Sequence, residues 1–234
     1  MWLAIDTSTR RTVLALYDEE SERMLVERIF EPRATQRVIF SELARILDGG
    51  SSQKINAIAV GIGPGSFTGV KIGVIAAKTL AWSRRIPLVG VGSLDAVAAG
   101  TALPRNLQTS LVVAVPSTRG EGYVQLYEAG KEKWTPVGPI RDVPLEAERL
   151  TTFLPPGPVL LSGEAAESFA RALTWKDDKV LADEDLRFPS ASGLLRLAMN
   201  RLKIGGIDDP LKLVPCYVRP TQPERLESGG SVDA

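Results

Sequence analysis

The spacing of hydrophobic residues divides the chain into short strand-like runs and longer helical segments. Runs rich in aliphatic and β-branched residues predict β-strands at 2–6, 12–18, 22–30, 55–62, 87–91, 111–115, 122–127 and 159–161. Apolar residues at helical spacing predict helices at 35–47, 67–82, 93–99, 164–173 and 190–202. We expect Pro32 to close the third strand, Ser93 to cap the third helix, and Ser190 or Ser192 to cap the last helix.

Both halves of the chain place strands before helices, which predicts two related α/β domains, each with a mixed sheet flanked by helices. A polar, proline-containing stretch at 101–109 is typical of a connection between domains. We therefore expect a first domain over 1–103 and a second over 104–219. Residues 220–234 combine Pro, Ser, Gly and charge with few apolar residues, which predicts a disordered tail.

Composition argues against several kinds of chemistry. The chain has no histidine and one cysteine, Cys216, which excludes Ser-His-Asp and Cys-His catalysis and argues against zinc sites. Lys plus Arg number 28 and Asp plus Glu also number 28, so no net field attracts nucleic acid or an anionic membrane. The sequence shows neither a signal peptide nor a membrane-spanning apolar stretch, and we expect a cytoplasmic protein. Carboxylate or magnesium chemistry remains open.

A glycine-rich segment lies between an apolar strand and a helix, where backbone N–H groups could bind a phosphate. The segment is not a P-loop, because Val70 follows Gly69 and the first lysine is Lys71. It also lacks the third glycine of a dinucleotide-binding fingerprint. We favour the interpretation that its glycines allow positive φ and close packing of strand and helix. The glycines expected to serve this structural purpose are Gly63, Gly65, Gly69 and Gly73.

The helix expected over 67–82 is apolar or small in nearly every direction, with Lys71 and Lys78 on one narrow stripe. Small residues recur at every fourth position from Gly65 to Ala81 and form a ridge that another backbone can approach closely. The helix over 35–47 has an apolar arc of about 160°, wider than a surface helix needs. Either the two helices cover each other over the sheet, or their surplus apolar surface binds a second polypeptide. We favour the second interpretation.

Five segments of the chain match the pattern of a known family: Leu3–Thr9, Gly63–Gly69 followed by Lys71-Ile72-Gly73, Ile86–Val91, Arg119–Tyr123 and Pro215–Arg219. Together they resemble the TsaB (YeaZ) family of bacterial proteins. The resemblance implies a two-domain actin-like or sugar-kinase-like fold, and a role in forming threonylcarbamoyladenosine next to the anticodon of tRNA. It implies a non-catalytic scaffold without a cofactor that binds a TsaD-type catalytic subunit. It also implies a TsaE-type ATPase in the same assembly, a homodimer when the protein is alone, and only indirect contact with tRNA.

In this family the first two helices of the first domain form the docking surface. The resemblance therefore implies an interface made by Val38, Ile39, Glu42, Phe67, Val70, Lys71, Val74 and Lys78. The first helix carries no histidine, so the metal ligands of the catalytic relative are missing here. In the second domain, Ser117 occupies a position where relatives often have aspartate.

Other functions compete with the scaffold. An actin-like ATP-dependent phosphotransferase would use Asp6 as a magnesium-linked carboxylate, with the hydroxyls of Thr7, Ser8 and Thr9 near phosphate. Alternatively, Asp6 is a turn residue that binds neighbouring backbone groups. A peptidase, a label attached to relatives of this fold, is disfavoured because the chain has no histidine. Direct RNA binding is disfavoured because the basic residues are dispersed.

Overall fold

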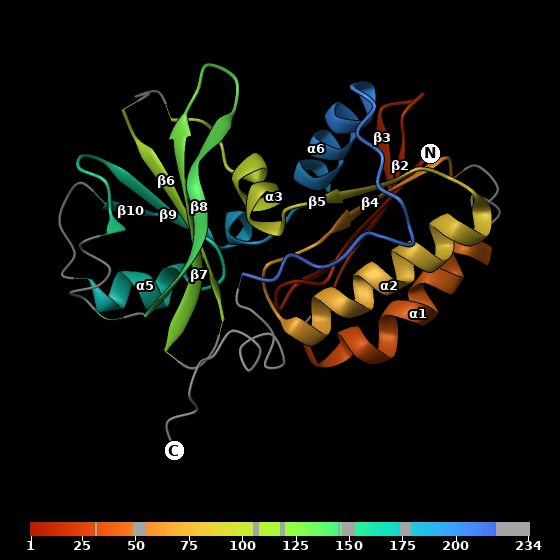
Figure 1. Cartoon of the computed structure of the whole chain (residues 1–234), viewed down its shortest axis with the longest axis horizontal. Helices are drawn as coiled ribbons and strands as arrows, with labels where there is room; N and C mark the ends of the chain where they lie inside the picture. Colours follow the sequence, from red (N-terminus) through yellow and green to blue (C-terminus); the bar gives the residue numbers. More distant parts are fainter. Residues whose placement is uncertain are drawn as a thin grey trace.

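Two five-stranded mixed sheets form the framework of the molecule (Figure 1). The computed structural model describes residues 1–30, 32–48, 55–104, 108–117, 120–144, 146, 153–173 and 179–218. The first sheet consists of β1 (Trp2–Asp6), β2 (Thr12–Asp18), β3 (Arg23–Phe30), β4 (Ala57–Gly61) and β5 (Leu88–Val91). The second consists of β6 (Ser110–Pro116), β7 (Glu121–Ala129), β8 (Trp134–Pro144), β9 (Val159–Ser162) and β10 (Lys179–Leu181).

The two sheets repeat one topology. In the same direction, the strand order is β3-β2-β1-β4-β5 in the first sheet and β8-β7-β6-β9-β10 in the second. In each sheet the first strand pairs antiparallel with the second and parallel with the fourth, so β6 corresponds to β1 and β9 to β4. The repeat confirms the expected fold class, a two-domain actin-like fold with helices on both faces of each sheet.

Helices cover the faces of the first sheet from two sides. The outer side is covered by α1 (Pro32–Asp48) and α2 (Phe67–Arg84), which pack on Leu3, Ile5 and neighbouring core residues. The opposite face is covered by α6 (Ala191–Lys203). Because β1 and β4 are buried on both faces, their sequences are continuous apolar runs rather than alternating ones.

The second sheet is covered by two shorter helices. One face packs against α5 (Ala166–Ala172), whose Phe169 is fully buried. The other face packs against α3 (Ser93–Gly100), which therefore lies between the two sheets (Figure 1). A short 3-10 helix, η2 (Glu184–Arg187), follows β10. None of the helices in the described ranges is long and apolar enough to cross a membrane.

The domain boundary expected at residues 103 and 104 stays a prediction, and packing crosses it in both directions. The helix α3 belongs to the first half of the chain but packs on the second sheet, whereas α6 returns to the first sheet. Residues 208–218, which we call the strap, also return to the first sheet, where Asp208 pairs with Leu88 at the edge of β5. Residues 220–234, expected to be a disordered tail, lie outside the described residues.

Several local expectations need correction. β3 ends at Phe30 as expected, but the next helix begins at Pro32 and not at residue 35, because proline is well suited to the first turn of a helix. Ser93 is the first residue of α3 and does not cap it, since its hydroxyl binds Asp6 and Gly63 instead. Ser190 is the cap of α6, and its hydroxyl accepts a bond from the Gly193 N–H at 3.0 Å.

Candidate functional site

Asp6 lies at the end of β1, where a phosphotransferase of this fold would need a free carboxylate. Its Oδ1 accepts bonds from the Ser8 N–H at 2.8 Å and the Ser8 hydroxyl at 2.6 Å. Its Oδ2 accepts a bond from the Ser93 hydroxyl at 2.8 Å, and that hydroxyl in turn accepts a bond from the Gly63 N–H at 3.0 Å. The carboxyl is fully buried, and this burial raises the pKa of Asp6. Asp6 therefore joins β1, the glycine-rich loop and α3.

The neighbouring hydroxyls also bind the chain's own backbone. Thr7 Oγ1 donates to the Gly69 carbonyl at 2.6 Å, and Thr9 Oγ1 donates to the Arg11 carbonyl at 2.9 Å. Together with Ser8 they line a cavity of about 490 Å³ between the two halves of the molecule. The cavity is bridged by the Arg10 N–H, which donates to Glu164 Oε2 at 3.0 Å. The structure thus brings the four nucleotide-site candidates together, with their polar groups committed to holding the turn.

The glycines of the segment make room for that same turn. A Cβ atom at Gly65 would lie 2.2 Å from the Ser8 carbonyl oxygen, and one at Gly69 would lie 2.1 Å from the Thr7 carbonyl oxygen. A Cβ atom at Gly73 would lie 2.3 Å from Thr7 Oγ1. The segment that approaches these glycines closely is therefore the chain's own β1–β2 turn. Gly63 has a φ of +87°, a conformation that favours glycine.

Residues expected at a partner interface fall into two groups. Ile39, Glu42, Val70 and Val74 are buried within the chain, because α1 and α2 direct these side chains toward the sheet and each other. Phe67 is exposed, Lys71 lies over its ring at 3.7 Å, and Val38 and Lys78 are half-buried. The buried four stabilise the fold and present little surface to another molecule.

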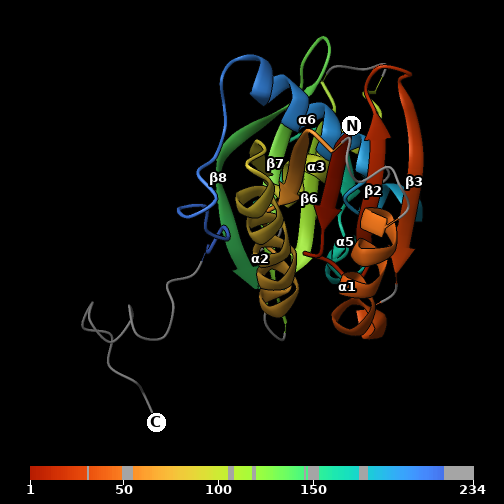
Figure 2. The same ribbon diagram turned by 90° about the vertical axis from the view of Figure 1, so that its right-hand side faces the viewer.

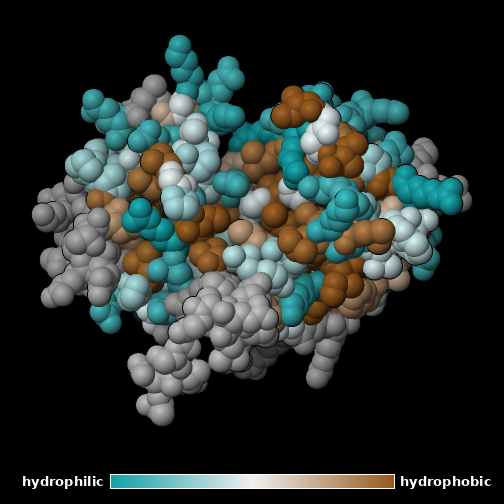
Figure 3. Space-filling view, in the orientation of Figure 1, coloured by the Kyte–Doolittle hydropathy of each residue, from teal (hydrophilic) through white to brown (hydrophobic). Residues whose placement is uncertain are grey.

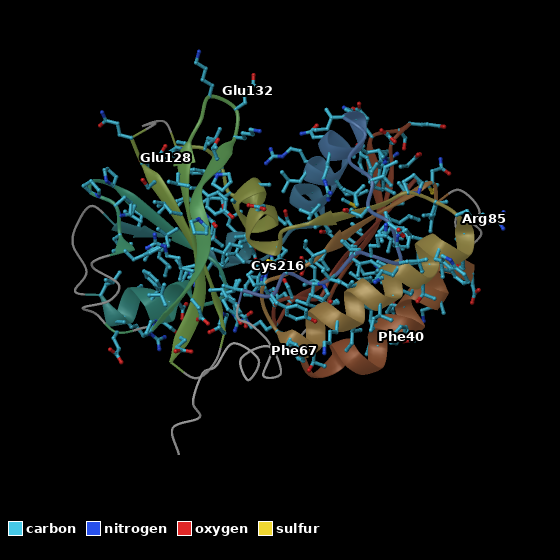
Figure 4. All side chains as sticks on the ribbon, in the orientation of Figure 1. Phe40, Phe67, Arg85, Glu128, Glu132 and Cys216 are labelled. Carbon is cyan, nitrogen blue, oxygen red and sulfur yellow. The ribbon has the colours of Figure 1, made fainter. Side chains whose placement is uncertain are left out.

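The outer surface of α1 and α2 carries other apolar side chains that sequence reasoning missed. Phe40 on α1 and Ile75 and Trp82 on α2 are exposed, Trp82 to 64%. Phe40 and Phe67 both lie on this helical face of the molecule (Figure 4). Helical spacing could have found them, since 68, 72, 75, 79 and 82 form one stripe of α2 opposite to its buried residues.

The strap lies beside α2 and extends this surface. Lys78 Nζ donates to the Leu213 carbonyl at 2.7 Å, the Cys216 N–H donates to the Ile62 carbonyl at 2.7 Å, and the rings of Phe67 and Tyr217 lie 5.8 Å apart. Viewed from the side, α1 and α2 lie next to each other with the strap beyond α2 (Figure 2). We call these three elements the α1–α2–strap layer.

Seven of the fourteen large apolar side chains that are exposed in the described ranges lie on the α1–α2–strap layer. They are Phe40, Phe67, Ile75, Trp82, Leu211, Val214 and Tyr217. The space-filling view shows hydrophobic surface along the α2 side of the molecule (Figure 3). The position of the strap could not be foreseen, because its contacts join residues more than a hundred positions apart.

The second domain offers fewer polar groups of interest. The Ser117 hydroxyl donates to Asp142 Oδ1 at 2.8 Å, which ties the end of β6 to β8. Arg119, which begins a segment of the family resemblance, lies outside the described residues. Within the described residues no three His, Cys, Asp or Glu side chains gather as a metal site.

Comparison with known proteins gives consistent matches. The sequence model of the family described as TsaD, tRNA N6-adenosine threonylcarbamoyltransferase, matches residues 38–194. The chain is 31% identical over 227 residues to the tRNA threonylcarbamoyladenosine biosynthesis protein TsaB of Escherichia coli K12, which covers 93% of this chain and 94% of that protein. It is 36% identical over 129 residues to the TsaB protein of Bacillus subtilis 168, covering 54% of each. Among solved structures, YeaZ from Pseudomonas aeruginosa is similar in fold, with a TM-score of 0.75, 24% identity and coverage of 93% of this chain and 99% of that one.

Proposed function

The chain belongs to the TsaB family of tRNA threonylcarbamoyladenosine biosynthesis proteins, and we propose that it serves this pathway as a non-catalytic scaffold that binds a TsaD-type catalytic subunit. The α1–α2–strap layer is the proposed docking surface. A TsaE-type ATPase in the same assembly, self-pairing of the free protein and indirect contact with tRNA are part of the same proposal.

The observation that carries the proposal is the concentration of exposed apolar side chains on one layer. Scattered surface apolar residues are normal, whereas a continuous set of aromatic and aliphatic side chains marks an interaction surface. Trp82, Tyr217 and the two phenylalanines are of the residue types enriched at the centre of protein interfaces. The occupied oxygens of Asp6 also favour a binding function over phosphoryl transfer, because both already accept bonds from the chain itself.

The test compares two single variants, Ile75→Glu and Val180→Glu, at positions whose side chains are about equally exposed. Ile75 lies on the proposed docking layer and is 58% exposed, whereas Val180 lies on β10 of the second sheet and is 60% exposed. We expect Ile75→Glu to weaken binding of a TsaD-type subunit by at least about thirtyfold, as the loss of a central interface residue does. Val180→Glu should change it by less than about threefold.

Isothermal titration with the full chain measures both affinities, and thermal unfolding checks that both variants remain folded. Equal binding by wild type and Ile75→Glu would refute the proposed docking layer. Light scattering after gel filtration measures self-pairing in the same samples. If the layer also serves a homodimer, Ile75→Glu should be monomeric where the wild type is dimeric.

A further inference from the structure

A second cavity lies away from the β1–β2 turn and is not explained by the docking proposal. Its volume is about 590 Å³, within the range of small-ligand sites. One wall is formed by β5, α3 and α6, and the other by the start of β8 and the loop before it. Figure 3 shows a notch between the two halves at the top of the view, above α3 and beside α6. A ligand here would contact both halves of the molecule.

Asp95 supplies a hydrogen-bond acceptor on the α3 wall of this cavity. Its Oδ1 accepts a bond from the Tyr127 hydroxyl at 2.8 Å, while Oδ2 has no hydrogen-bond partner among the described residues. Oδ2 lies beside Gly92, where an added Cβ atom would come within 2.4 Å of it. Since Gly92 also lines the cavity, the absence of a side chain there leaves the carboxylate open on that side. Burial raises the pKa of Asp95, as expected for a carboxyl without a nearby cation.

Positive charge lies at the rim of the same cavity. Arg196 on α6 donates to the Ala99 carbonyl, and Lys133 forms no ion pair with any described residue. Arg201 also lines the cavity, but Asp208 holds its guanidinium with two bonds of 2.7 and 2.8 Å. The acidic residue of the rim, Glu132, lies at the tip of the β7–β8 hairpin (Figure 4). Arg196 and Lys133 are thus the cations free to meet an anionic group.

We propose that this cavity binds a nucleotide unit, with a base amino group donating to Asp95 Oδ2 and the phosphate held by Arg196 and Lys133. Asp95 and the Ala99 carbonyl that orients Arg196 are four residues apart on α3, about 6 Å along the helix axis. The acceptor and the cations therefore lie at separate ends of one site. Leu197, Trp134 and Pro136 supply apolar surface between them, suited to the face of a base.

Pyrimidine nucleotides give the sharpest test, because cytosine presents an amino donor where uracil presents a carbonyl acceptor. We expect CMP to bind the full-length protein at least about tenfold more tightly than UMP, since the UMP carbonyl would face the Asp95 carboxylate. Cytidine without phosphate should bind more weakly than CMP by a similar factor. Isothermal titration or ligand-observed NMR at millimolar concentrations measures all three.

Two substitutions separate the base contact from the phosphate contact. Asp95→Asn places an amide donor beside the base, so the preference should shift from CMP toward UMP, a reversal that a folding defect cannot produce. The double variant Lys133→Ala/Arg196→Ala should bind CMP no better than cytidine. Lys212→Ala on the strap, whose side chain is 85% exposed, is the matched control and should bind CMP like the wild type.

The nucleotide could be free or part of an RNA strand, and a short oligocytidine compared with oligouridine distinguishes the two sources. Binding of oligocytidine that is lost in the double variant, with weak binding of CMP, would identify an RNA strand as the source. Equal binding of CMP and UMP, an unchanged CMP affinity in Asp95→Asn, or no binding of any probe would overturn the proposal.

Discussion

At the scale of single residues, Gly69 shows that the residue type at a helix position can be determined by a neighbouring segment and not by helix propensity. Alanine is normally about 1 kcal/mol better than glycine inside a helix. At this position, however, a Cβ atom would lie 2.1 Å from the Thr7 carbonyl oxygen, a backbone atom that cannot easily move. We expect Gly69→Ala to lower the free energy of unfolding by about 1–3 kcal/mol, measured by urea denaturation.

The matched control is Thr79→Ala on the exposed face of α2, where the higher helix propensity of alanine should act alone. That variant should be unchanged or stabilised by a few tenths of a kcal/mol, about the difference in propensity. A stabilised Gly69→Ala would mean that the β1–β2 turn does not press on α2.

The buried carboxyl of Asp6 predicts a distinctive pH dependence. Its pKa is raised above the ordinary value of 3.8, so the folded state binds this proton more tightly than the unfolded state does. The contribution of Asp6 to stability is therefore full below about pH 3.8 and declines as pH rises through the higher pKa of the folded state.

The asparagine variant isolates this effect because it cannot titrate. The unfolding free energy of wild type minus that of Asp6→Asn should fall as pH increases from 4 toward neutrality, measured by urea denaturation at several pH values. A difference that grows with pH would show that the hydrogen bonds from Ser8 and Ser93 outweigh burial.

At the scale of elements, α2 ends in an unfavourable backbone conformation. Arg85 follows the helix with a φ of +56°, while its N–H bonds the carbonyls of Ala81 and Trp82. Glycine adopts this left-handed conformation without steric cost. Arg85→Gly should therefore raise the thermal unfolding midpoint, because the free energy of unfolding should increase by about 0.5–1 kcal/mol at most. A lowered midpoint would show that the Arg85 side chain contributes more than its backbone costs.

The elements also show which parts of the molecule local sequence determines. The strands of both sheets that precede their helices, and α1, α2 and α6, follow directly from apolar periodicity. β8 and β10 were missed because β8 is largely exposed and contains Pro136 and Pro139, and β10 has three residues. The sequence indicated that α2 has more apolar and small residues than one helix face needs. In the structure some of these residues contact the core, the β1–β2 turn or the strap, and the others lie in the exposed stripe.

At the scale of the whole molecule, the two halves of the chain depend on each other. α6 covers one face of the first sheet, and the strap bonds the edge of β5 through Asp208. A fragment of residues 1–103 would expose the face that contains Trp2, Ala4 and Val89. We expect this fragment to lack a cooperative unfolding transition, measured by circular dichroism during urea denaturation. A cooperative transition would show that residues 1–103 fold as an independent domain.

The site was only partly accessible from sequence for the same reason. The nearness of Asp6, Ser8 and Gly63 could be inferred, because these residues lie at strand ends of one sheet. The strap could not, since Lys78 and Leu213 are 135 positions apart. The cavity beside Asp95 could not either, since it needs Tyr127, 32 positions from Asp95, and α6, whose Arg201 bonds Gly90 across 111 positions. Contacts between segments that are far apart in the sequence leave no pattern in either segment alone.

The central claim is that a partner covers the α1–α2–strap layer. Hydrogen exchange measured by mass spectrometry, with and without a TsaD-type subunit, tests it most directly. Peptides from 38–48, 67–84 and 208–218 should exchange more slowly in the complex, while peptides covering the β7–β8 hairpin should be unchanged. Slower exchange confined to the second sheet, with α2 unaffected, would contradict the account.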